Sequence, residues 1–141
     1  MPTNSLSKLK DILENLPDGV YGNYSDDLME LNILGGVGYS IGILKNNNIA
    51  IAKTVVSKGG IFSPHYHKEF EIIIVYKGEL KIWENANSLE DKKGSKEFTL
   101  KEKDIITIDP NTPHIAEAIV DTQFIAITIP SSKRFPNAKK T

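Results

Sequence analysis

The twenty residues from Gly59 to Gly78 decide the fold, and they read GGIFSPHYHKEFEIIIVYKG. Two of the three histidines of the chain, His65 and His67, stand two residues apart in this stretch, and Glu71 follows four residues later. Successive side chains of an extended strand alternate between its faces, so His65 and His67 can approach one ion from the same side. The stretch therefore predicts a metal site on an extended segment.

The third histidine, His114, follows the turn sequence Pro-Asn-Thr-Pro and begins another apolar segment. We expect a neighbouring strand to bring it against the first pair. Three imidazoles and the carboxylate of Glu71 suit one divalent transition metal, namely iron, manganese, nickel, zinc, cobalt or copper. In a six-coordinate ion this set leaves two positions open, unlike a closed structural zinc site. The site carries a charge of about +1, which favours an anionic or enolate-forming ligand.

Glu69 is a rival to Glu71 as the carboxylate ligand, because both share the parity of His67 along a regular strand. Glu117 and Tyr66 are out of phase with the neighbouring histidines, so we expect both to point away from the site. Strand parity cannot decide whether Trp83 lines the mouth of the pocket or packs between the sheets.

Outward from this stretch, short apolar segments alternate with turn residues along most of the chain. The turn sequences Lys45-Asn46-Asn47-Asn48 and Lys77-Gly78 mark two hairpins. At least eight short strands of this kind predict an all-β sandwich or barrel. They are expected at residues 39–44, 49–56, 71–76, 79–84, 97–100, 105–108, 115–120 and 124–129.

The N-terminal region differs from this pattern. Leucines recur there at steps of three and four from Leu6 to Leu16, and Pro17-Asp18-Gly19 ends the segment, which predicts a short amphipathic helix. We expect residues 1–36 to pack on the barrel as a helix and lead-in segment, residues 37–130 to form the barrel, and residues 131–141 to be a basic, solvated tail.

Composition excludes several classes of function. The chain has 17 basic and 18 acidic residues, a net charge of -1, so it has no electrostatic footprint for a nucleic acid or an anionic membrane. It has no cysteine, which excludes disulfides, thiolate zinc sites and a cysteine nucleophile. The first residues lack the apolar core of a signal peptide, and no apolar run is long enough to span a membrane. We therefore expect a cytoplasmic protein.

The deciding stretch resembles the first motif of the cupin family, which reads G, five residues, H-x-H, three or four residues, E, six residues, G. Gly59, His65, His67, Glu71 and Gly78 match every defined position. The resemblance implies a double-stranded β-helix, the jelly-roll barrel of cupins, with His65, His67, Glu71 and His114 as metal ligands.

The second cupin motif reads G, five residues, P-x-G, two residues, H, three residues, N, and residues 103–118 align with it at His114. Lys103 and Asn111 stand where the motif has glycine, and Asn tolerates a positive φ better than most residues. Asp109 replaces the proline. Ala118 replaces the final Asn, which is not a ligand in the family.

The cupin resemblance implies dioxygenases, isomerases, epimerases and decarboxylases as candidate activities. Our first hypothesis is a metal-dependent, dioxygenase-like enzyme that acts on a small molecule, with Glu71 also able to accept a proton. The alternative is a non-catalytic module that binds or senses a small molecule. An acid–base group inside the pocket would discriminate them, and the sequence shows none beyond the four ligands, so the catalytic residues are unknown. The resemblance also implies a homodimer.

Overall fold

The computed structural model describes residues 29–45, 48–130 and 139–140 of the 141-residue chain, and every regular element within these ranges is a strand. The strands are β1 (Met29–Glu30), β2 (Gly38–Lys45), β3 (Ala50–Val56), β4 (Ile61–Tyr66), β5 (Phe70–Lys77), β6 (Glu79–Glu84), β7 (Lys96–Lys101), β8 (Ile105–Ile108), β9 (His114–Ala118), β10 (Thr122–Ile129) and β11 (Lys139–Lys140). No helix among the described residues is long and apolar enough to cross a membrane.

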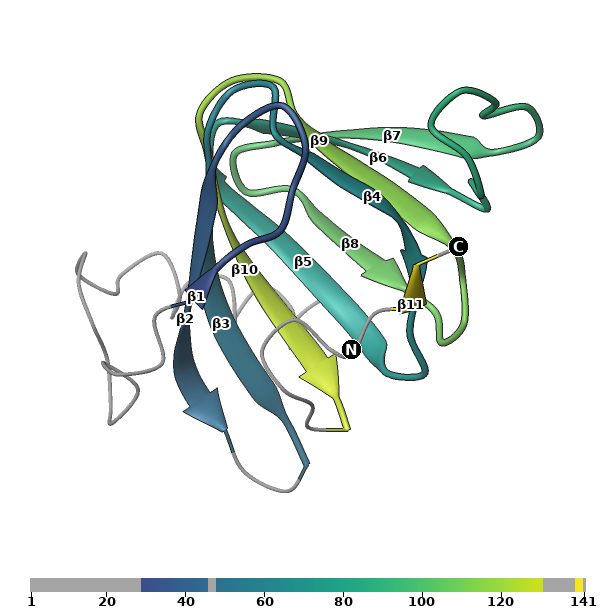
Figure 1. Cartoon of the computed structure of the whole chain (residues 1–141). Coiled ribbons are helices and arrows are strands. Elements are labelled where there is room, and N and C mark those ends of the chain that lie inside the picture. Colours follow the sequence, from purple (N-terminus) through teal and green to yellow (C-terminus); the bar gives the residue numbers. More distant parts are fainter. Residues whose placement is uncertain (1–28, 46–47, 131–138, 141) are drawn as a thin grey trace.

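The strands form two antiparallel sheets that face each other (Figure 1). Sheet A has the order β1-β2-β3-β10-β5-β8, and sheet B has the order β11-β4-β9-β6-β7. From β3 to β6, and again from β7 to β10, each strand belongs to the sheet opposite to that of the strand before it, which is the connectivity of a jelly roll. The all-β jelly-roll prediction is confirmed, and the eight predicted strands match observed ones with small shifts at their ends.

Three strands were not predicted: β1, β4 and β11. β4 contains Pro64, which has no N–H to donate to a ladder and so argues against a strand in the sequence. The structure accommodates Pro64 where the register between β4 and β9 shifts, between Phe62 and His65. The predicted N-terminal helix at Leu6–Leu16 lies outside the described residues, as does residue range 131–138 of the tail.

The strand registers show which side chains face the space between the sheets, because paired residues on neighbouring strands lie on the same side of a sheet. The core there is built from aliphatic and aromatic residues of both sheets, among them Val56, Ile73, Leu80, Ile82 and Phe124. Burying each of these side chains contributes about 1.5–3 kcal/mol.

Trp83 lies on the other side of sheet B, so neither alternative left by strand parity holds. Its ring packs with Ile115 and Ala86, and its Nε1–H donates to Glu97 at 2.9 Å. Lys92 lies 4.9 Å from the ring centroid. Trp83 thus anchors the loop between β6 and β7 and does not line the interior.

Lys103 and Asn111 take positive φ angles of 75° and 62°, although neither is glycine. These are the two positions at which the second sequence motif carries glycine. The chain therefore keeps the backbone conformation of the motif without its glycines. A positive φ costs conformational energy in a residue with a β-carbon, and this cost is larger for Lys103 than for Asn111.

Replacing Lys103 by glycine is expected to raise the free energy of unfolding by about 0.5–1 kcal/mol. The left-handed conformation costs a residue with a β-carbon about 1–2 kcal/mol, and the greater freedom of glycine in the unfolded chain offsets part of that gain. Urea unfolding of the native chain, Lys103→Gly and Lys103→Ala measures the effect. A glycine variant that is no more stable than the alanine variant would contradict this prediction.

Candidate metal centre

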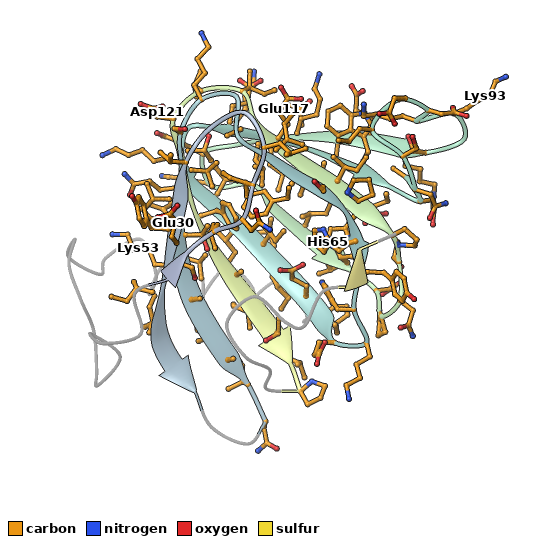
Figure 2. The ribbon with its side chains drawn as sticks, viewed as in Figure 1. Glu30, Lys53, His65, Lys93, Glu117 and Asp121 are labelled. Atoms are coloured by element: carbon orange, nitrogen blue, oxygen red, sulfur yellow. The ribbon has the colours of Figure 1, made fainter. Side chains whose placement is uncertain are left out.

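The three histidines converge at one end of the sandwich. Their ligand atoms all lie within 4.8 Å of one another. The ring centroids of His65 and His114 are 4.2 Å apart, and those of His67 and His114 are 5.2 Å apart. Figure 2 shows His65 on the side of sheet B that faces sheet A. The convergence predicted from the sequence is thus present in the structure.

Both sheets contribute to this cluster. His65 on β4 and His114 on β9 are paired across the ladder of sheet B, which places their rings side by side. His67 lies just after β4, in the short connection that crosses to sheet A. Glu71 comes from β5 of sheet A, and its Oε1 lies 3.2 Å from His67 Nε2 and 3.7 Å from His114 Nε2. The carboxylate therefore closes the cluster from the opposite sheet.

Each imidazole is held by a hydrogen bond from Nδ1 to a backbone carbonyl two residues away. His65 Nδ1 is 2.7 Å from the oxygen of Ser63, and His114 Nδ1 is 2.8 Å from that of Thr112. His67 Nδ1 is 2.9 Å from the oxygen of Glu69. Because a carbonyl only accepts, Nδ1 carries the proton in all three rings and Nε2 of the neutral ring keeps its lone pair. This is the arrangement that orients metal-binding histidines.

The charges of the cluster follow from its burial. Burial lowers the pKa of His114 to about 4, and the nearby His65 adds to the shift. Burial likewise lowers the pKa of His65, although its bond to Ser63 and the charge of Glu71 oppose the shift. Both rings are therefore neutral near pH 7 and need not lose a proton before Nε2 binds a cation.

His67 and Glu71 form the charged pair of the cluster. Burial disfavours the charged form of His67, but the hydrogen bond and the charge of Glu71 outweigh it and raise the pKa of His67. Burial would raise the pKa of Glu71, but the hydrogen bond from His67 and the positive charge of that ring outweigh burial and lower it. Glu71 is thus a carboxylate, with only 7% of its surface exposed.

This set of donors fits a divalent transition metal. Ligands bound to one ion at about 2.1 Å lie about 3–4 Å apart, close to the separations found here. The three histidines form a group of possible ligands around one point, and a carboxylate oxygen of Glu71 lies against Nε2 of two of them, His67 and His114. The described contacts place Glu71, and not Glu69, against two imidazoles, whereas Glu69 offers His67 its backbone carbonyl.

The registers add two polar residues that the sequence did not single out. Glu84 on β6 is paired with His114, and Thr128 on β10 is paired with Glu71. Both therefore face the same space as the cluster. The sequence shows no acid–base group beyond the four predicted ligands, and the structure places the carboxylate-bearing Glu84 next to His114. The position of Glu84 beside His114 follows from the register between β6 and β9, and this register cannot be derived from a single sequence.

Glu117 lies on the opposite side of sheet B, as predicted. It is paired with Ile61 and Lys81, out of phase with the inward residues Ala116 and Ala118. Figure 2 shows it on the outer face of the sandwich. Tyr66 follows His65 directly on β4 and is half-buried.

The solved structures that resemble this fold include three described here. An RmlC-like cupin from Shewanella frigidimarina has a TM-score of 0.63 and 16% identity, over 82% of this chain and 95% of that one. KdgF from Halomonas sp. has a TM-score of 0.63 and 15% identity, over 83% of this chain and 97% of that one. Oxalate decarboxylase from Bacillus subtilis, a protein with Mn(II) centres, has a TM-score of 0.64 and 19% identity over 88% of this chain.

This chain spans only 34% of the oxalate decarboxylase chain. At such identities the likeness establishes a shared fold and does not transfer an activity. No curated protein sequence matches the chain significantly. The sequence profile of the family described as Cupin matches residues 39–139, more than half of the chain, and the protein therefore belongs to the cupin family.

Proposed function

We propose that this protein binds one divalent transition metal through His65, His67, Glu71 and His114. The observation that carries the proposal is the convergence of the three rings, each held at Nδ1 by a backbone carbonyl so that Nε2 is the nitrogen left to bind a cation. Glu71 adds a negative charge that a bound cation would compensate. Manganese is the first metal to test, because the Mn(II)-containing oxalate decarboxylase shares the fold.

We further propose that the protein is an enzyme that acts on a small molecule, with dioxygenase-like chemistry as the leading class. A divalent ion at this site would supply Lewis-acid chemistry and open positions for substrate oxygens. His65 and His114 are neutral and keep the lone pairs of Nε2, whereas His67 would release its Nε2 proton on binding a cation. The lowered pKa of Glu71 makes it a better ligand than proton acceptor. We also expect the protein to act as a homodimer in the cytoplasm.

Turnover by the metal-loaded protein tests the enzymatic part of this proposal. Protein reconstituted with Mn(II) or Fe(II) is incubated in air with small hydroxy acids, keto acids and enol-forming compounds, while oxygen uptake and product NMR spectra are followed. Conversion of a compound that His114→Ala does not convert supports an enzyme. Binding of a compound without any conversion contradicts it and favours the non-catalytic binding module.

The choice between Glu71 and Glu69 as the ligand gives a separate prediction. Glu71→Gln is expected to reduce bound metal sharply, because it removes the anionic oxygen beside His67 and His114. Glu69→Gln is expected to leave bound metal nearly intact, since the contact from Glu69 to His67 uses its backbone carbonyl. Metal content after equilibrium dialysis against Mn(II) measures both variants. An equal loss in the two would overturn the ligand assignment.

A further inference from the structure

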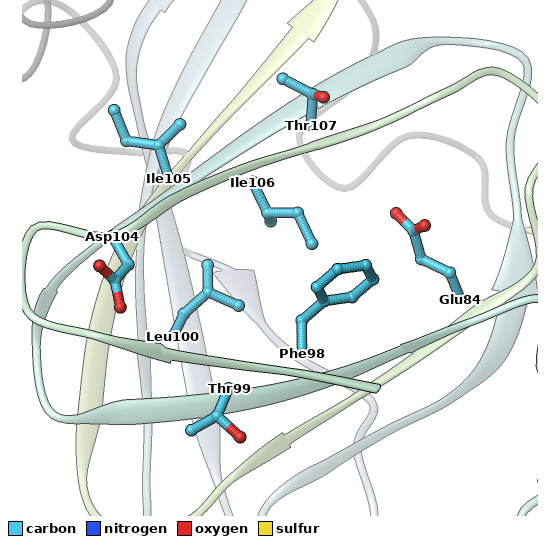
Figure 3. Close-up of a pocket in the computed structure, with 8 residues that line it drawn as sticks. All are labelled: Glu84, Phe98, Thr99, Leu100, Asp104, Ile105, Ile106 and Thr107. Atoms are coloured by element: carbon cyan, nitrogen blue, oxygen red, sulfur yellow. The ribbon is translucent and has the colours of Figure 1, made fainter. Parts of the chain in front are cut away.

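An open pocket with a volume of about 490 Å³ lies between β7 and β8, the last strands of sheets B and A (Figure 3). Phe98 and Leu100 line it from β7, and Ile106 approaches them from β8. Glu84 of β6 stands beside Phe98 with its carboxylate directed into the same space. The pocket is thus an opening at the side of the sandwich with one carboxylate in its inner wall.

Glu84 connects this pocket to the metal centre. On sheet B, His65 is paired with His114, and His114 is paired with Glu84, so the three residues form one row on one side of the sheet. Directly paired residues have β-carbons about 4.5–5.5 Å apart. A glutamate side chain at this position reaches a molecule bound beside His114.

The opposite wall leads to the same place. Ile108 on β8 is paired with Glu71, and Ile106 lies two residues before it, on the same side of sheet A. On this side of β8, Ile106 is therefore the neighbour of Ile108, which is itself the cross-strand partner of Glu71. Both walls of the pocket, Glu84 and Ile106, thus adjoin residues of the candidate metal centre.

The lining selects for a particular chemistry. Its charged residues are Glu84 and Asp104, both acidic, and its remaining residues are apolar or carry hydroxyls. Lys96, the other cross-strand neighbour of Glu84, is exposed and does not line the pocket, and its positive charge and the negative charge of Asp109 act on Glu84 in opposite directions. A second anionic group on a ligand would meet carboxylates here, whereas an ammonium or hydroxyl group would find an acceptor.

We propose that this pocket is a ligand subsite, in which Glu84 accepts a hydrogen bond from the ammonium or hydroxyl group of a small molecule with an apolar body. The inference rests on the proposed function, because the other end of that molecule binds the metal through oxygen. Phe98 supports the apolar body, and Glu84 is a specificity-determining residue that rejects ligands with a distal carboxylate.

Hydroxamates test this subsite, because the hydroxamate group binds a divalent metal through two oxygens whatever group it carries. The protein is loaded with Co(II), and its visible spectrum is titrated with acetohydroxamate, benzohydroxamate, 4-(aminomethyl)benzohydroxamate and 4-carboxybenzohydroxamate. In the native protein the aminomethyl compound is expected to bind at least about tenfold more tightly than the carboxy compound. In Glu84→Gln the two affinities are expected to differ by less than about threefold.

Three comparisons give this test its controls. Glu84→Gln should keep the native Co(II) content and the native affinity for acetohydroxamate, which does not reach the pocket. Phe98→Ala should lower the preference for benzohydroxamate over acetohydroxamate by about threefold to tenfold, the effect of one aromatic contact. Glu117→Gln removes a carboxylate from the outer face of the same sheet and should match the native protein throughout.

The outcomes separate the subsite from the metal site. Normal Co(II) content with an unchanged ratio of aminomethyl to carboxy affinity in Glu84→Gln would overturn the subsite alone. The subsite would also be overturned if Glu117→Gln changed the ratio of aminomethyl to carboxy affinity as much as Glu84→Gln does. Absence of Co(II) uptake by the native protein would overturn the proposed function and the subsite with it. If Glu84→Gln does not fold, the native affinity order and Phe98→Ala still decide the proposal.

Discussion

Replacing His114 by alanine is expected to lower the affinity for Mn(II) or Fe(II) at least about 100-fold. His114 is the central residue of the cluster, since its ring lies beside those of His65 and His67 and its Nε2 is 3.7 Å from Glu71. Its removal deletes one donor and leaves the other three spread around an empty centre. Isothermal titration with Mn(II), or competition with a chelator of known affinity, measures the change.

The matched control for this prediction lies on the same strand. Glu117→Ala removes a side chain from the opposite face of β9 and should keep native metal affinity. His114→Ala should itself fold, because it exchanges a buried polar ring for a small apolar side chain in a β-strand; thermal unfolding of the metal-free variants checks this. A folded His114→Ala protein with native affinity would show that the metal, if one binds, is held elsewhere.

Replacing Gly78 by alanine is expected to lower the free energy of unfolding by about 2–4 kcal/mol. Gly78 joins β5 to β6 with φ at +94°. A β-carbon there would overlap the carbonyl oxygen of Asp121 and would lie 2.7 Å from Thr122 Oγ1 and 2.8 Å from Thr122 Cα. Two of these atoms belong to the backbone, so the clash cannot be relieved by turning a side chain. For a chain of this size the melting temperature should fall by roughly 5–15 °C.

Gly94 provides the control for the steric part of that effect. Its φ is +81°, similar to that of Gly78, but a β-carbon at Gly94 would have no neighbour within 4 Å. Gly94→Ala should therefore cost only the strain of a positive φ, about 1–2 kcal/mol. If both variants lost the same stability, the close approach of Thr122 to Gly78 would carry no cost. The last glycine of the first motif would then be needed for its backbone angle alone.

Much of the fold could be predicted from the sequence because hydrophobic alternation and turn residues are local signals. Glu79–Glu84 and Ile105–Ile108 were predicted with the observed bounds. β4 was predicted only as an extended segment around His65 and His67, because Pro64 opposes a strand locally and the pairing with β9 stabilises one there. The sheet contact of Lys139–Lys140 with β4 was missed for a similar reason, since a basic pair carries no strand signal.

The candidate site could be predicted in part. The spacing of His65, His67 and Glu71 marks one cluster, and the motif adds His114. The backbone carbonyls that orient the rings leave no trace in the sequence, because any residue supplies one. Glu84 was missed since its nearness to His114 depends on the register of β6 against β9, which is a property of the folded sheet.

Elemental analysis of the purified, untagged protein tests the central claim most directly. The protein is dialysed against metal-free buffer after exposure to Mn(II), Fe(II), Ni(II) or Zn(II) and is compared with the double variant His65→Ala/His67→Ala. The account predicts about one transition metal ion per chain in the native protein and almost none in the variant. No retained metal in either protein, or equal amounts in both, would contradict a metal centre at these residues.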